Sequence, residues 1–188
     1  MGLYKLSDLE NRLAKRIDET FAQGELIKAA SSPLTSFDIF LSHSYLDAKP
    51  ILSLKEDIES MGFSVYVDWI EDSEMNRAMV TRENANMLRE RMNNCKCLFF
   101  AFSGNAKRSV WMPWELGYMD AVASKVAILP ILGGTCDDFK KQEYLELYPY
   151  ITRDIGTDDD MTLWVNDGSD NKYVHLKEWL QGKEPSRR

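Results

Sequence analysis

Two long apolar runs in the chain limit the folds that it can adopt. They are Cys97–Phe102 and Val126–Leu132, and neither alternates apolar with polar residues. Alternation is typical of a strand with one face in solvent, whereas an unbroken run is typical of a strand covered on both faces, as in a parallel sheet. Pro130 removes one backbone donor, which predicts that the second strand ends or meets an edge nearby. The sequence therefore predicts a sheet between two layers of helices.

Strands and helices alternate from Phe37 onward. Further strands are predicted by apolar runs at Phe37–Leu41, at Phe63–Val67 and, more briefly, near Thr162–Val165. Helices are predicted between the N-cap Asp47 and Gly62, over Thr81–Asn94, near Gln142–Leu147 and near Tyr173–Gln181. This alternation predicts an α/β protein with a flavodoxin-like three-layer fold, whose five-stranded parallel sheet has the order 2-1-3-4-5.

The first 33 residues are predicted to form an amphipathic helix and a linker. Ser7–Glu10 is a capping box, and Ser31-Ser32-Pro33 is typical of a linker. The apolar residues at helical spacing are Leu6, Leu9, Leu13, Ile17 and Phe21. This apolar stripe is expected to pack either on the main domain or on its copy in a partner chain. The chain is thus divided into residues 1–33, a domain at 34–183 and a tail at 184–188.

Composition argues against several classes of function. The 188 residues include 23 Lys and Arg against 30 Asp and Glu, and the net charge of −7 disfavours sequence-independent binding to nucleic acid or to an anionic membrane surface. No apolar run approaches the roughly 20 residues that cross a bilayer, and the first residues lack the pattern of a signal peptide. A cytoplasmic location is therefore expected. Cys95 and Cys97 have no second pair of metal ligands, so no metal site is expected.

The order 2-1-3-4-5 places a ligand crevice between the loop after the first strand and the loop after the third. The first loop contains Ser42 and His43, and the second leads from Ser103 to Trp111 and Glu115. Trp111 and Glu115 stand four residues apart at the start of a helix, so they share one face. A carboxylate beside a flat ring suits a cationic, ring-bearing ligand. Packing of the helix onto the sheet explains Trp111 equally well.

Charged side chains near this crevice suggest where a phosphate group would lie. Arg77, Lys107 and Arg108 are candidate partners of a pyrophosphate. The start of the helix near Ser109 also favours anions, because its backbone N–H groups have no intrahelical partners. Asp68 lies farther from the crevice in this topology and is expected to support the loop or an interface.

Three segments resemble one family in the same order. Phe37–Ser44 is similar to the opening strand of a bacterial TIR domain. Gly62–Asp68 is similar to the second strand of that domain and the start of its BB loop. Ser109–Glu115 is similar to the family segment that contains Ser, Trp and, four residues after the Trp, Glu. The resemblance covers about residues 36–132. The loop at 70–77 departs from the family pattern because it is charged and lacks a Gly-Pro tip.

The resemblance implies an enzyme that uses NAD+ as a substrate and needs no cofactor. In enzymatic members the Glu four residues after the Trp is catalytic, so the resemblance assigns this role to Glu115 and places Ser42 and His43 at the border of the pocket. Nicotinamide leaves as a neutral molecule, so one carboxylate that stabilises the oxocarbenium charge is sufficient. Capture by water would give ADP-ribose, and capture by a nucleophile at the adenine end of the molecule would give a cyclic isomer. Both outcomes stay open.

The resemblance also implies partners. Self-association through TIR–TIR contacts is expected, and similarity to TIR proteins of antiphage defence systems such as Thoeris implies a separate effector or sensor protein. Two other functions stay open. One is a non-catalytic TIR module that assembles through its BB loop, and the other is a nucleoside deoxyribosyltransferase-like enzyme, which shares the sheet topology and the N-glycosidic chemistry.

Overall fold

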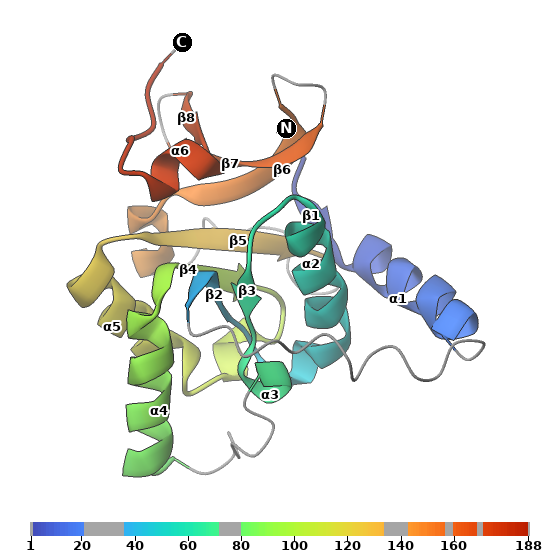
Figure 1. Cartoon of the computed structure of the whole chain (residues 1–188), viewed down its shortest axis with the longest axis horizontal. Helices are drawn as coiled ribbons and strands as arrows, with labels where there is room; N and C mark the ends of the chain where they lie inside the picture. The colour runs from blue at the N-terminus through green and yellow to red at the C-terminus, as the bar shows by residue number, and fades with distance from the viewer. Residues whose placement is uncertain are drawn as a thin grey trace.

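Four parallel strands form the centre of the sheet, in the order β3-β2-β4-β5 (Figure 1). The computed structural model describes residues 2–20, 36–71, 80–133, 143–156, 160–168 and 171–187. The central strands are β2 (Phe37–Ser42), β3 (Val65–Tyr66), β4 (Cys95–Phe102) and β5 (Val126–Leu132). The predicted α/β fold class is confirmed, and so is the 2-1-3-4 part of the strand order.

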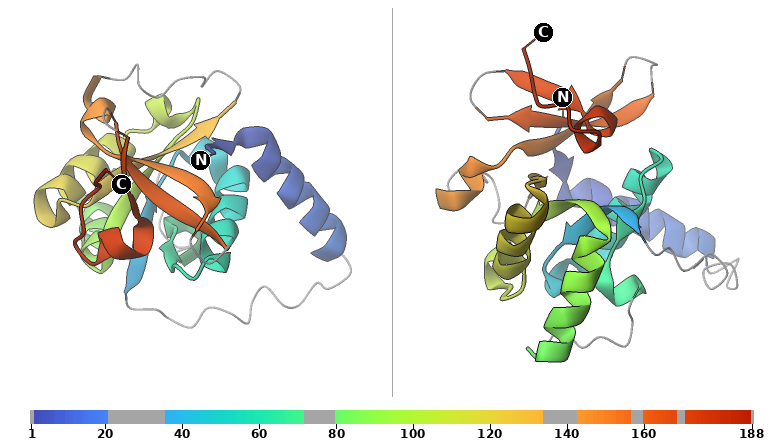
Figure 2. Two further views of the ribbon diagram at one scale, coloured as in Figure 1. Left: turned by 90° about the horizontal axis from the view of Figure 1, so that it is seen from above. Right: turned by 60° about the vertical axis from the view of Figure 1, so that its left-hand side comes forward.

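Helices cover both faces of this sheet because neighbouring residues of each strand point to opposite sides. From β2, Ile39 and Leu41 join the core formed with α2 (Ala48–Ser60). Phe40 joins the other core, formed with α4 (Arg82–Asn93) and α5 (Met112–Ala123). Figure 2 shows the layers from two further directions. Two apolar cores therefore fix the helices against the strands.

Local sequence explains where these helices begin. The Thr81 hydroxyl accepts a hydrogen bond from the backbone N–H of Asn84 at 3.1 Å and caps α4. Pro113 lies in the first turn of α5, where its missing N–H leaves no bond unmade. The short elements at the crevice are η1 (Tyr45–Asp47), α3 (Asp68–Glu71) and η2 (Ala106–Arg108). Among the helices of the described residues, none is long and apolar enough to span a membrane.

Beyond β5 the sheet continues with strands that the sequence predicts only in part. β6 (Tyr150–Ile155) pairs in parallel with β5 through Tyr150, and β7 (Met161–Asp167) and β8 (Lys172–His175) follow in antiparallel pairing. The expected fifth strand is thus β7, which is antiparallel and one place farther from β5. Over the described residues the sheet has eight strands in all.

Two helices at this end of the chain also differ from the expectation. The segment near 142–147 is the 3-10 helix η4 (Glu143–Leu147), and the helix expected from Tyr173 is α6 (Leu176–Leu180), because residues 172–175 form β8 instead. Val174 pairs with Val165 on β7, so a row of β-branched side chains outweighs the local helical pattern.

The N-terminal residues add a strand that the sequence does not predict. β1 (Tyr4–Lys5) pairs in parallel with Ile131 and Leu132, beyond the last residue of β5 that pairs with β4. Helix α1 (Leu6–Thr20) then lies beside α2, and Leu9 is buried in the core. The helix begins at Leu6, so Ser7 lies inside it rather than capping it. The expected linker lies outside the described residues, and the division at residue 33 stays a prediction.

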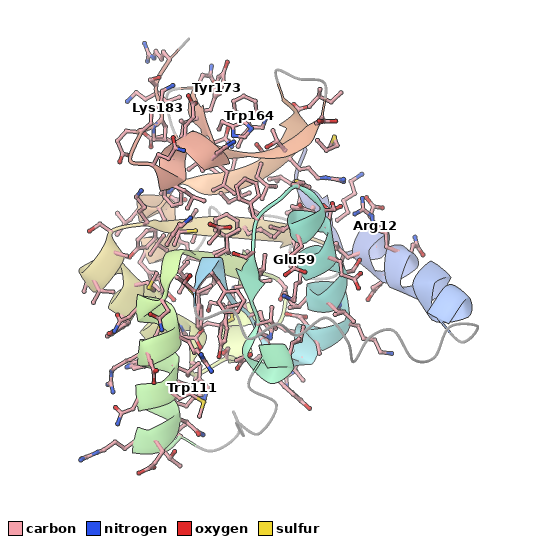
Figure 3. The ribbon with its side chains drawn as sticks, viewed as in Figure 1. Arg12, Glu59, Trp111, Trp164, Tyr173 and Lys183 are labelled. Atoms are coloured by element: carbon pink, nitrogen blue, oxygen red, sulfur yellow. The ribbon has the colours of Figure 1, made fainter. Side chains whose placement is uncertain are left out.

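Asp57 on α2 joins the N-terminal segment and β6 to the rest of the fold. Its buried carboxylate accepts a hydrogen bond from the Tyr4 hydroxyl at 2.9 Å and forms ion pairs with Arg12 and, at 3.1 Å, with Arg153. Figure 3 shows Arg12 on the side of α1 that faces α2. Burial, followed by the charge of Asp57, holds the pKa of the Tyr4 hydroxyl well above its usual range. Tyr4 therefore stays a hydrogen-bond donor at neutral pH.

We expect Asp57→Ala to lower the free energy of unfolding by about 3 kcal/mol, because it leaves the buried Tyr4 hydroxyl and two partly exposed guanidinium groups without their shared acceptor. Urea unfolding of the full chain measures this change. Asp167→Ala is the matched control, since Asp167 is exposed and its carboxylate lies 3.8 Å from the Lys172 ammonium. Equal stability of the two variants would show that the Asp57 cluster contributes no more than a surface ion pair.

Candidate functional site

The carboxyl ends of β2 and β4 carry the crevice that the topology predicts. Ser42 is the last residue of β2, and Glu115 lies in the first turn of α5, which follows β4. The Ser42 hydroxyl donates a hydrogen bond to Oε2 of Glu115 at 2.6 Å, and both side chains are fully buried. The structure therefore brings together two of the predicted site residues, which are 73 positions apart in the sequence.

Burial of Glu115 requires stabilisation of its charge, since an isolated buried carboxylate is very unfavourable. The hydrogen bond from Ser42 supplies part of this stabilisation. The position in the first turn of α5 supplies more, because the N-terminal end of a helix attracts negative charge. Glu115 is thus a buried carboxylate held in place at the edge of the sheet. In this structure a ligand reaches it only if the side chains that cover it move.

His43 lies next to Ser42, and each of its ring nitrogens faces a polar neighbour. Its Nδ1 lies 2.9 Å from the carbonyl oxygen of Leu41. Because a carbonyl only accepts, Nδ1 carries a proton and donates it. Its Nε2 faces the Asp68 carboxylate, with 3.8 Å between Nε2 and Oδ1, and both side chains are buried. No sequence pattern paired His43 with an acid, and the expectation that Asp68 lies farther from the crevice is wrong, because its carboxylate faces His43.

Asp47 forms a second network across the crevice. The sequence correctly places it at the N-cap of α2, but its side chain makes no capping hydrogen bond. Instead, one carboxylate oxygen accepts from the Ser103 hydroxyl and the other from the Asn105 amide at 2.7 Å. The Ser103 hydroxyl in turn accepts from the backbone N–H of Asn105 at 3.1 Å. Ser103 is thus engaged in joining the loops after β2 and β4, and its contact with a substrate stays a prediction.

Trp111 is buried in the core between α5 and the sheet. Only 6% of its surface is exposed, and its ring packs edge-on against Trp114 with 5.5 Å between ring centroids. Trp114 in turn stacks on Tyr118 and lies under the guanidinium of Arg89. These contacts agree with the packing role that was one of two expectations for Trp111. Stacking of its ring on a ligand stays a prediction.

Three cations remain among the residues expected near the crevice. Arg77 lies outside the described residues. Lys107 and Arg108 belong to η2 and are exposed to solvent. The surface that borders the crevice instead presents apolar side chains, since Tyr45 on η1 is 68% exposed and Val110 before α5 is 70% exposed.

Comparisons with known proteins find two relatives. The chain is 47% identical, over 195 aligned residues, to a Bacillus cereus (strain MSX-D12) protein named probable 3′ cyclic ADP-D-ribose synthase ThsB′, and the match covers 96% of this chain and 99% of that protein. It is 29% identical over 107 residues to the putative cyclic ADP-D-ribose synthase TIR2 of Cytobacillus dafuensis, covering 56% of this chain and 26% of that protein. No family model matches the chain.

We expect Asp47→Ala to destabilise the protein by about 2 kcal/mol, because the buried donors of Ser103 and Asn105 lose a charged acceptor. Hydrogen exchange at the Asn105 backbone N–H should be faster in this variant, and exchange in the centre of β4 should be unchanged. Asp160→Ala, at an exposed position just before β7, serves as the control. Unchanged exchange at Asn105 would show that Asp47 does not hold the loop after β4.

Proposed function

The chain belongs to the bacterial TIR family that includes the Bacillus cereus ThsB′ protein, and we propose that it is an enzyme that cleaves the nicotinamide–ribose bond of NAD+. The products would be nicotinamide and either a cyclic ADP-ribose isomer or ADP-ribose. The names of both relatives, cyclic ADP-D-ribose synthases, favour the cyclic product. The observation that carries the proposal is the buried Glu115 carboxylate, oriented by Ser42 at the carboxyl edge of a parallel sheet.

One carboxylate can support this chemistry. The bond between ribose C1′ and the nicotinamide nitrogen breaks, and its electron pair stays on nicotinamide, which leaves as a neutral molecule. The positive charge that develops on the ribose is then stabilised by Glu115 in a site from which water is largely excluded. A nucleophile of the adenosine half attacks C1′ and loses its proton to give a cyclic product, or water attacks and loses a proton to give ADP-ribose. The hydrogen bond from Ser42 restricts Glu115 to one orientation during these steps.

The other residues of the crevice would bind and position the substrate. We assign His43, whose Nδ1 donates to the carbonyl oxygen of Leu41 and whose Nε2 faces Asp68, to the wall of the site beside Ser42. Ser103 and Trp111 remain candidates for ribose and ring contacts once the crevice opens. Arg77, which lies outside the described residues, remains a candidate for the pyrophosphate.

We further propose where the protein acts and with which partners. Self-association through TIR–TIR contacts would use the apolar rim of the crevice, at Tyr45, Leu46 and Val110, which is exposed in the single chain. A cytoplasmic location and a separate effector or sensor protein, as part of antiphage defence, would follow from the family. NAD+ would be consumed as a substrate, and no cofactor is needed.

Glu115→Gln should lower the rate of nicotinamide release from NAD+ at least about 100-fold, because the amide keeps the size of the side chain and removes its charge. Chromatography with mass detection measures nicotinamide and the second product, which is lighter by one water when cyclic. Glu146→Gln, at an exposed position of η4, should keep full activity. Equal rates of nicotinamide release for wild type and Glu115→Gln would contradict the assignment of Glu115 as the catalytic residue. If both rates are zero at high protein concentration, the result would favour the alternative of a non-catalytic module.

Ser42→Ala should lower kcat about 10- to 100-fold with a smaller effect on KM. One hydrogen bond to a charged group contributes about 1.5–3 kcal/mol, and this bond orients the carboxylate rather than holding the substrate. Steady-state kinetics with NAD+ separates the two parameters, and thermal unfolding of the variant shows whether the fold is kept. A rise in KM alone would instead mean that Ser42 contacts the substrate and does not position Glu115.

A further inference from the structure

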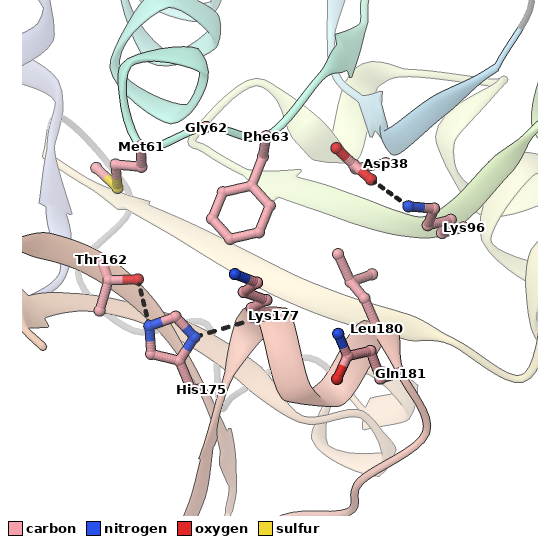
Figure 4. A pocket seen from close by; sticks show the side chains of 10 residues that line it. All are labelled: Asp38, Met61, Gly62, Phe63, Lys96, Thr162, His175, Lys177, Leu180 and Gln181. Atoms are coloured by element: carbon pink, nitrogen blue, oxygen red, sulfur yellow. Dashed lines mark hydrogen bonds and ion pairs between the residues drawn. The ribbon is translucent and has the colours of Figure 1, made fainter. Parts of the chain in front are cut away.

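A cavity of about 600 Å³ lies at the opposite edge of the sheet from Glu115. Asp38 and Lys96, the second residues of β2 and β4, border it. Ser42, by contrast, ends β2 at the other edge. The remaining wall comes from the turn after α2, with Phe63, and from α6 and the strands before it (Figure 4). The cavity is therefore separate from the crevice, and its volume lies in the range of small-molecule sites.

The walls of this cavity are fixed by interactions on its outer side. The Lys125 ammonium donates to the carbonyl oxygens of Trp179 at 2.8 Å and of Leu180 at 3.0 Å, which holds the end of α6 against the start of β5. Trp179 itself is buried in the core. On the other wall, Gly62 adopts a φ of 88°, which turns the chain sharply between α2 and β3 and presents Phe63 to the cavity. The cavity is thus formed before any ligand binds.

His175 is held in its neutral form beside the cavity. Its Nδ1 accepts a hydrogen bond from the backbone N–H of Lys177 at 3.2 Å. Since a backbone N–H only donates, the ring proton is on Nε2, which donates to the Thr162 hydroxyl at 2.8 Å. Both ring nitrogens are therefore engaged, and His175 contributes a flat, uncharged surface.

The charges at the cavity favour an anion. Asp38 is paired with Lys96 at 2.7 Å. Although partial burial opposes ionisation, hydrogen bonds from Lys96 and Ser64 hold the pKa of the Asp38 carboxyl below its usual range, so this pair is neutral overall. Lys177 adds a second cation, which forms no ion pair with another described residue. Figure 4 shows its ammonium and the Phe63 ring pointing toward each other.

We propose that this cavity binds a nucleoside phosphate, with the base beside Phe63 and the phosphate at Lys177. An aromatic ring with the apolar side chains of Met61 and Leu180 suits a flat heterocycle. The Gln181 side chain offers both a donor and an acceptor to the edge of a base. Lys177 supplies the charge that a phosphate requires on a protein whose net charge is −7. This site does not depend on cleavage of NAD+ at Glu115.

The test uses AMP and adenosine as probes of the full-length protein. Calorimetric titration of wild type should show that AMP binds at least 10-fold more tightly than adenosine, which lacks the phosphate. Lys177→Glu should weaken the binding of AMP at least 10-fold and leave the affinity for adenosine unchanged. Lys172→Glu, on β8 but outside the cavity, is the matched control and should bind AMP as wild type does. Unchanged affinity of Lys177→Glu for AMP, or no AMP binding at millimolar concentration, would overturn the proposal.

A second variant tests the base. Phe63→Leu keeps an apolar side chain and removes the ring, so it should weaken the binding of AMP and the binding of adenosine by similar factors of about 10. Amide chemical shifts on adding AMP should change at Phe63 and Gln181, and those at Ser42 and Glu115 should not. Changes confined to the crevice would assign the binding to the Glu115 site instead. Glu115→Gln should bind AMP at the cavity as wild type does, whether or not it cleaves NAD+.

Discussion

The hydrogen bond between Ser42 and Glu115 is the interaction on which the crevice depends. A carboxylate without exposure to solvent requires a fixed partner, and here that partner comes from a strand far away in the sequence. The bond forms only because β2 lies directly beside β4, with Ser42 in register with Phe100. Strand order, register and the start of α5 therefore determine the position of one oxygen atom. A slip of one residue would turn Ser42 to the other face of the sheet.

Two further acids of the crevice follow the same logic. Asp47 is held by Ser103 and Asn105, and Asp68 faces the imidazole of His43. The two carboxylates thus face side chains from different loops, Asp47 from the loop after β4 and Asp68 from the loop after β2. The loops after β2, β3 and β4 are therefore joined at the carboxyl edge by polar contacts in addition to the apolar side chains that they bury. Polar networks of this kind fix the positions of the side chains that take part in them.

The sequence predicts the parts of the fold that depend on local pattern. Unbroken apolar runs identify β4 and β5, and the rule for ligand sites in such sheets brings Ser42 and Glu115 together. The sequence does not predict β6, because Thr152, Arg153 and Asp154 interrupt its apolar pattern. It does not predict β1 either, because that strand has only two residues. The contacts of Asp47 and Asp68 cannot be predicted from the sequence for another reason. Asp47 and Ser103 are 56 positions apart, and no spacing rule connects residues at that distance.

The strands beyond β5 explain why the molecule has a second concave surface. The crevice at Glu115 needs only β2, β4 and α5. The chain from β6 to α6 instead buries Leu176 and Trp179 against the core beside α2, and its end is fixed by Lys125 at the start of β5. This places α6 opposite the turn that carries Phe63, and the space between them stays open to form the cavity. Because β2 and β4 run from one surface to the other, a ligand at the amino edge would bind to the same two strands that position the crevice.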